Sequence, residues 1–301
     1  LALLSVTLIS VLLVVLIPYR VYVNILKYLT LSLFAYVVAA FSIKQDWLEI
    51  IRHTILPQIG SSSVYWLNIV AILGTTISPY LFFWQANQEV EEEVSQKKLR
   101  IMGIGKPNIT IRDIAHLRVD TVVGMVFSNV IALFIMITTA STLHQQGITT
   151  ITSAPEAAAA LKPFAGEFAS VLFTLGILGT GLLSIPVLAG SIAYALAEAF
   201  RQKEGLYRPF QKARFFYGAI MIATLIAMAI NFLHVEPFRL LYYAAIFNGL
   251  CTPPLLIMIV LIGNNKQIMG RHANSMWSNL GATVLTALMT AATGLLIWQV
   301  L

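Results

Sequence analysis

The chain has 301 residues, of which 58% are hydrophobic and only 11% are charged, and its mean hydropathy is +0.82. A soluble domain carries about 25% charged residues, so this composition excludes a soluble globular protein and predicts one transmembrane domain over residues 1–301. The net charge of +6 does not indicate a nucleic-acid partner, because the basic residues lie in short connections between apolar segments, where lipid head groups explain them.

Eight apolar segments approach or exceed the length of about 20 residues that a membrane helix needs. They lie at 1–18, 24–43, 63–90, 119–142, 167–198, 213–233, 237–263 and 275–300. An all-α polytopic membrane protein is therefore predicted. Asp120 is expected at the N-terminus of the fourth helix, where the macrodipole favours a carboxylate. The chain starts inside an apolar run and without Met, so we expect it to be N-terminally truncated.

The basic residues sort to one side of the membrane if all eight segments cross it. Fifteen of the 19 lysines and arginines lie in alternate connections, at 19–27, 93–118, 201–214 and 264–273. Cytoplasmic loops carry such an excess. These four connections are therefore predicted to be cytoplasmic, in an integral protein of a bacterial inner membrane.

The third segment contains the stretch Gly74-Thr75-Thr76-Ile77-Ser78-Pro79-Tyr80. Pro79 has no N–H to donate and Gly74 adds backbone freedom, so we expect the helix to break here. Broken membrane helices are tolerated where they are buried in protein or line a cavity, and transporters use their free ends to bind ions and substrates. We predict that this break is the substrate site, the alternative being a proline kink in a packing helix.

Polar residues follow the break. Gln85 needs a partner or water at membrane depth, and with Tyr80 we assign it to the substrate pathway. Asn129, in the fourth segment, either bonds another helix or faces that pathway. Four glutamates, Glu89 and Glu91–Glu93, either concentrate departing cations or form a solvated helix end paired with nearby lysines.

The seventh segment has Pro253 and Pro254 in its middle. Two consecutive prolines remove two helical donors, so a second interruption is predicted there. Asn248, just before them, offers a neutral carbonyl oxygen that could coordinate a hard cation or bridge two helices.

The sequence gives no support for enzyme chemistry or a bound cofactor. Its five histidines form no i, i+4 pair. It also contains no HExxH, no glycine-rich phosphate loop, no CxxC and no GxSxG motif.

The stretch Gly74–Tyr80 resembles the sixth-helix signature of the NRAMP divalent-metal transporters, G-x-T-x-M-P-H-N. The run Phe173–Gly190, with GTGLLS inside it, and the run from Pro253 to Gly270 are similar to that family in order and spacing. The resemblance covers nearly the whole chain.

This resemblance implies a leucine-transporter-like (APC) inverted-repeat fold. Residues 1–43 would end the first repeat, 63–263 would form the second, and 275–300 would be an additional C-terminal helix. The first three helices of the family fold, including the broken first helix with its Asp-Pro-Gly metal-binding motif, would be missing.

The family's metal-binding Met and His positions are occupied here by Ser78 and Tyr80. Carried over by position, the Thr75 carbonyl and the Ser78 side chain become candidate metal ligands. Asn248 could replace the tenth-helix Gln, whose position falls on Ala245. A thioether favours softer metals, whereas hydroxyl and carbonyl oxygens favour hard ions.

The resemblance therefore implies a secondary transporter of a divalent cation working by alternating access. The ion would be Mn²⁺ or Fe²⁺, or, given Ser78, Mg²⁺ or another hard ion, with protons as a candidate coupling ion. One alternative is a Na⁺- or H⁺-coupled symporter of an amino acid or small organic solute, and another is a non-transporting membrane subunit. In the leading prediction the metal is a substrate, and the lipid bilayer is the other partner.

Overall fold

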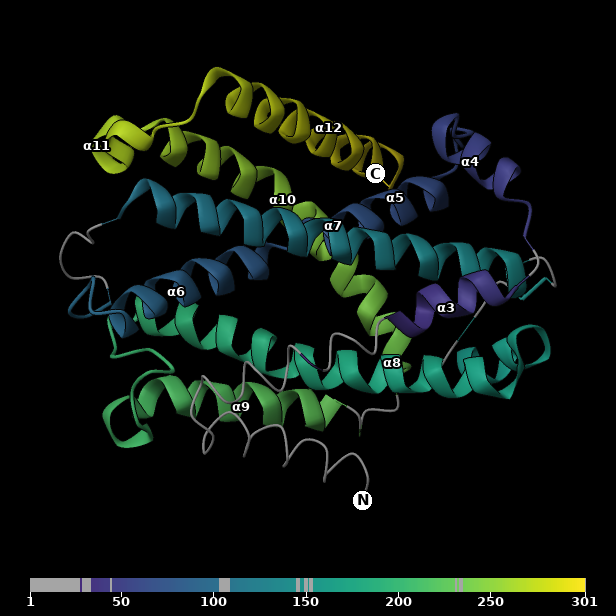
Figure 1. The fold of residues 1–301 in the computed structure, drawn as a ribbon, viewed down its shortest axis with the longest axis horizontal. Helices are drawn as coiled ribbons and strands as arrows, with labels where there is room; N and C mark the ends of the chain where they lie inside the picture. The colour runs from purple at the N-terminus through teal and green to yellow at the C-terminus, as the bar shows by residue number, and fades with distance from the viewer. Residues whose placement is uncertain are drawn as a thin grey trace. The chain divides into compact units, whose positions relative to one another are not determined.

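The apolar segments form helices, as a hydrocarbon environment requires when no water is present to hydrogen-bond the backbone. A computed structural model describes residues 28, 34–43, 45–102, 109–144, 147–148, 151, 154–230, 232 and 235–300. The elements found in these residues are α3 (Phe34–Ser42), α4 (Trp47–Ile55), α5 (Ser63–Thr76), α6 (Pro79–Ser95), α7 (Ile111–Thr142), α8 (Ala154–Ala199), α9 (Arg214–Ile230), α10 (Pro237–Asn264), α11 (Lys266–Met269) and α12 (Met276–Val300), with 3-10 turns at Phe210–Lys212 and Gly270–His272 (Figure 1).

Within the described residues, five helical stretches are long and apolar enough to cross a membrane. They are Ser63–Ser95, Ile111–Thr142, Thr174–Ala199, Pro237–Asn264 and Met276–Gln299. Five of the eight predicted segments are thereby confirmed in length and composition, and α9, with 17 residues, is a shorter helix at a sixth. α3 covers part of the segment 24–43, and the segment 1–18 lies outside the described residues. The chain is an all-helical polytopic membrane protein.

α7 begins earlier than hydropathy indicates. A capping box fixes its start: Thr110 Oγ1 accepts from the Asp113 N–H at 3.3 Å, and Asp113 Oδ2 accepts from the Thr110 N–H at 2.9 Å. The carboxylate in the first turn is therefore Asp113, and the prediction that Asp120 occupies it is wrong. Hydropathy marks where the apolar region starts, whereas the cap marks where the helix starts.

α10 runs without interruption from Pro237 to Asn264 and contains Pro253 and Pro254. The predicted second interruption is therefore wrong, since helix continues on both sides of the two prolines. The missing N–H groups still leave the carbonyls four residues earlier, those of Gly249 and Leu250, without their helical donors.

The chain divides into two compact units. The first contains Tyr80–Glu236 and the described residues up to Ile50, and the second contains Ile51–Pro79 and Pro237–Leu301. α3 and α6–α9 belong to the first unit, and α5 and α10–α12 belong to the second. These units do not test the predicted single domain or its division into repeats, which stay predictions.

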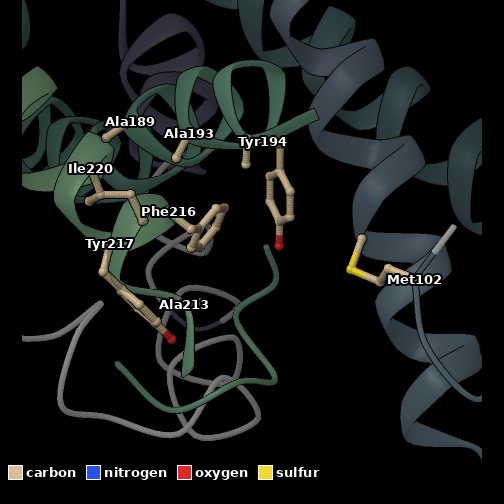
Figure 2. Packing of buried hydrophobic residues seen from close by; sticks show 9 residues of the cluster. Met102, Ala189, Ala193, Tyr194, Ala213, Phe216, Tyr217 and Ile220 are labelled. Atoms are coloured by element: carbon tan, nitrogen blue, oxygen red, sulfur yellow. The ribbon is translucent and has the colours of Figure 1, made fainter. Parts of the chain in front are cut away.

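In the first unit, small residues on α8 face aromatic residues on α9 (Figure 2). Ala189, Ala193 and Ala197 recur every fourth residue and so share one face of α8. Tyr194 and Phe216 are fully buried, with ring centroids 4.7 Å apart. Small residues allow membrane helices to approach closely, so these alanines let α9 pack against α8.

In the second unit, α5 packs against α10 and α12. Val70 is fully buried and lies in a cluster with Ala292 and Leu296 of α12. The Tyr242 hydroxyl of α10 donates to Asn68 Oδ1 of α5 at 2.7 Å. The α5–α10 pair thus combines apolar packing with a hydrogen bond between helices.

α7 presents a largely apolar exterior. Val122, Val123 and Val126 are 60%, 63% and 58% exposed. Aliphatic side chains exposed to this extent on a long apolar helix fit a surface that faces lipid.

Candidate functional site: a broken helix and its α10 contact

The break between α5 and α6 lies at Ile77 and Ser78. Ile77 leaves the helical conformation, with φ −109° and ψ 69°, although its N–H still donates to the Leu73 carbonyl at 2.8 Å. Pro79 is the first residue of α6, a position where its missing N–H is not needed. The local sequence thus ends one helix and starts the next within two residues.

Ser78 is 2% exposed and turns its hydroxyl back onto the end of α5. Its Oγ donates to the Thr75 carbonyl at 2.8 Å and lies 3.2 Å from the Gly74 carbonyl oxygen. A hydroxyl oxygen keeps its lone pairs when it donates, and a carbonyl oxygen has two. The two predicted ligands, the Thr75 carbonyl and the Ser78 hydroxyl, are therefore adjacent and both can still accept.

The threonine side chains of this stretch take no part in that arrangement. Thr75 Oγ1 and Thr76 Oγ1 both donate to the Ile72 carbonyl at 2.8 Å. The oxygen that Thr75 offers near Ser78 is accordingly its backbone carbonyl, the atom that the resemblance implies.

α10 approaches the end of α5 backbone to backbone. A Cβ added at Gly74 would overlap the Ala245 carbonyl oxygen and the Gly249 nitrogen, and would lie 2.8 Å from Gly249 Cα. A Cβ added at Gly249 would in turn overlap Val70. The two glycines therefore permit a crossing that larger residues would prevent.

The side chain of Thr252 forms a hydrogen bond between α10 and the end of α5. It is fully buried, and its Oγ1 lies 2.7 Å from the Asn248 carbonyl oxygen and 3.1 Å from that of Ile77. Ile77 belongs to the break, so this hydroxyl connects α10 to the break. The Asn248 oxygen that it contacts is the backbone carbonyl of its own helix, and not the side-chain oxygen predicted as a ligand. The position of Thr252 before two prolines gave no signal of this role in the sequence.

The three predicted metal ligands thus lie in one unit, on two helices that meet at the break. All three offer neutral oxygens. Among the described residues, no group of three or more His, Cys, Asp or Glu could hold a metal ion. Neutral oxygens can coordinate a hard cation that has lost part of its water. These three ligands carry no negative charge that would balance the charge of the ion.

The predicted pathway residues all lie in the other unit. The Tyr80 carbonyl accepts from Ser191 Oγ of α8 at 3.1 Å. Gln85 Nε2 donates to Thr121 Oγ1 of α7 at 3.0 Å. Asn129 is exposed, and its Nδ2 donates to the Met125 carbonyl of its own helix at 2.8 Å. Gln85 therefore joins two helices, while Asn129 bonds within one.

A buried carboxylate on α6 was missed by the sequence analysis. Glu91 is 2% exposed, so the solvated helix end considered for the four glutamates is wrong at this position. Trp84, Gln88 and Glu91 follow helical spacing, and each contacts Tyr194 of α8. This spacing is visible in the sequence and indicates that Glu91 shares a helix face with Trp84 and Gln88.

Comparison with known proteins gives a consistent match. A family model described as natural resistance-associated macrophage protein-like matches residues 1–299. The divalent metal cation transporter MntH of Caldanaerobacter subterraneus subsp. tengcongensis is 25% identical over 268 residues, which cover 89% of this chain and 58% of that relative.

Two further relatives carry the same name. MntH of Clostridium acetobutylicum is 22% identical over 258 residues, covering 85% of this chain and 54% of the relative. MntH of Deinococcus radiodurans is 22% identical over 247 residues, covering 80% and 51%. The chain spans about half the length of the curated relatives it matches.

Proposed function

This chain belongs to the Nramp family, and on that basis we propose that it moves a divalent metal cation across a membrane by alternating access. The relatives are named as transporters, so the chain is a transport protein and not an enzyme, and the metal ion is a substrate and not a cofactor. The observation that carries the proposal is the break at Ile77–Ser78, where the Ser78 hydroxyl lies beside the Thr75 carbonyl and Thr252 of α10 bonds the Ile77 carbonyl.

We further propose that the ion is hard. Ser78 stands where the family has a thioether, and its hydroxyl lies beside the Thr75 carbonyl at 2.8 Å. Oxygen ligands suit Mg²⁺, which gives up its bound water reluctantly. A thioether favours softer transition metals such as Mn²⁺ and Fe²⁺. Asn248 on α10 is the proposed third ligand, and Tyr80, Gln85 and Asn129 are proposed to line the pathway.

The membrane setting completes the proposal. The chain is an integral membrane protein, and the relatives are bacterial, which supports an inner-membrane location. The basic connections at 19–27, 93–118, 201–214 and 264–273 are proposed to face the cytoplasm. The first of these lies outside the described residues. The inverted-repeat arrangement is likewise carried over from the family resemblance.

Isothermal titration of the protein in lipid nanodiscs with Mg²⁺ and Mn²⁺ tests the site. The wild type is expected to bind Mg²⁺, and Ser78→Met is expected to shift the ratio of the two affinities toward Mn²⁺ by about tenfold, or about 1.4 kcal/mol. Ser128→Met is the matched control, because Ser128 is exposed on α7 and bonds the Met125 carbonyl of its own helix at 3.1 Å.

Two results would contradict the proposal. Equal shifts in Ser78→Met and Ser128→Met would remove Ser78 from the site. Absence of binding of either metal, together with binding of an amino acid that Ser78→Met abolishes, would favour the organic-solute symporter instead.

A further inference from the structure

Glu91 lies near the end of α6, well along the helix from the break that starts at Ser78. Its Oε1 accepts from the Tyr194 hydroxyl of α8 and from the Leu206 N–H in the connection between α8 and α9. Gln88 Nε2 donates to the same Tyr194 oxygen at 3.3 Å. Three segments of the first unit therefore converge on one carboxylate.

The connection reaches this carboxylate through an unusual backbone conformation. Gly205 has φ +115°, a region that favours glycine. A Cβ added there would lie 3.1 Å from Glu91 Oε1. The Glu204-Gly205-Leu206 stretch is thereby held directly against Glu91.

Among the residues that the structure describes, three buried oxygens at this point have no hydrogen-bond partner. They are Gln88 Oε1, Glu91 Oε2 and Glu204 Oε2. Buried polar atoms are almost always hydrogen-bonded, and a buried carboxylate oxygen that lacks a donor is unfavourable. Two of the three belong to carboxyl groups, which can themselves become donors by binding a proton.

In the part of the chain that the structure describes, no cationic side chain hydrogen-bonds to these three oxygens. The charged groups facing Glu204 are Glu198 of α8, Glu91 of α6 and Arg208. Burial, followed by the Glu198 and Glu91 carboxylates, raises the pKa of Glu204 to about 7, against a smaller lowering by Arg208. The Arg208 guanidinium stacks on the Tyr207 ring, 5.0 Å from its centroid, and its Nε donates to the Tyr207 hydroxyl.

We propose that Glu91 and Glu204 share one proton, and that this proton holds the end of α6 against the α8–α9 connection. The proton enters from solvent at Glu204, which is partly exposed, and forms an O–H bond on one carboxyl that donates to the other. When it leaves, the two carboxylates repel each other and the contact weakens. The site binds a proton at a place distinct from the candidate metal ligands.

Infrared difference spectra of the protein in nanodiscs, recorded over pH about 5 to 9, test the shared proton through the stretch of the protonated carboxyl. We expect a carboxyl that titrates near neutrality and is lost in Glu204→Gln. In Glu91→Gln its midpoint should fall by about one pH unit, a tenfold loss of proton affinity. Glu92→Gln, a change at an exposed neighbour on α6, should keep the wild-type midpoint.

Hydrogen exchange of the last turn of α6 tests the holding contact. After correction for intrinsic rates, exchange at Val90–Ser95 should be at least about tenfold faster above the midpoint than below it, a difference that Glu91→Gln removes. Tyr194→Phe keeps both carboxyl groups of the pair. The infrared band of the protonated carboxyl should therefore remain in this variant, even if amide exchange at Val90–Ser95 becomes faster.

The proposal is overturned by any of three results. The first is a spectrum without a neutral-range carboxyl, and the second is a midpoint that Glu91→Gln leaves unchanged, because Glu204 would then titrate alone. The third is a band that saturating Mg²⁺ or Mn²⁺ removes in the wild type and in Glu92→Gln alike, which would make the pair a metal site.

Discussion

Gly74 offers the sharpest test of the crossing between α5 and α10. In Gly74→Ala the new methyl group would lie 2.8 Å from Gly249 Cα and still closer to two other backbone atoms. Carbon atoms sit at about 3.5 Å in good contact, so the helices must separate by at least about 0.7 Å. Backbone atoms cannot rotate away as a side chain can, and such overpacking costs about 1–3 kcal/mol.

Gly294→Ala on α12 is the matched control, because a Cβ there meets no atom of the described residues within 4 Å. Both substitutions gain up to about 1 kcal/mol of helix propensity, so their difference isolates the overlap. We expect Gly74→Ala to have a free energy of unfolding about 1–3 kcal/mol below that of Gly294→Ala, and to weaken Mg²⁺ binding.

The assay is reversible unfolding in mixed micelles of increasing denaturing detergent, followed by far-ultraviolet circular dichroism. Metal binding is measured on the same samples. Equal unfolding free energies for the two variants would refute the close crossing. A loss of stability with unchanged metal affinity would refute the link between that crossing and the ligands Thr75 and Ser78.

Three other outcomes are expected. Thr252→Val removes the hydroxyl at the break and should lower the unfolding free energy by about 1 kcal/mol, whereas Thr290→Val, an exposed change on α12, should not. Thr110→Ala removes the α7 cap and should cost about 1 kcal/mol, visible as faster amide exchange in the first turn of that helix. Because the pKa of Glu204 is raised from 4.5 to about 7, its stabilising contribution is present below pH about 4.5 and is lost as pH rises through about 7. Glu204→Gln should therefore gain stability relative to the wild type over that range in detergent titrations, and a constant difference would contradict the raised pKa.

Hydropathy predicted the spans because lipid imposes the same demand on every crossing helix: apolar side chains and a fully bonded backbone. The break at Ser78 could also be anticipated, since a proline without an N–H after glycine and hydroxyl residues is a local property. The resemblance then directed attention to the Thr75 carbonyl and the Ser78 side chain, which the structure places side by side.

Local rules were less reliable where two of them competed. At α7 the prediction followed the apolar boundary near 119 and did not use the Thr110–Asp113 capping box, although both residues are visible in the sequence. At α10 the two prolines indicated an interruption, yet the helix continues through them. Only the packing of α10 against α5 showed that the Thr252 hydroxyl contacts two backbone carbonyls, that of Asn248 in α10 and that of Ile77 after α5.

The sequence by itself determined the class of protein, five of its apolar spans and the position of the broken helix, because each depends on neighbours along the chain. Tertiary structure alone decided which of four nearby glutamates is buried. That choice depends on Tyr194 and Leu206, more than 100 residues away. A side chain's hydrogen-bond partners and solvent access are set by the elements packed around it, so its chemistry follows from the fold.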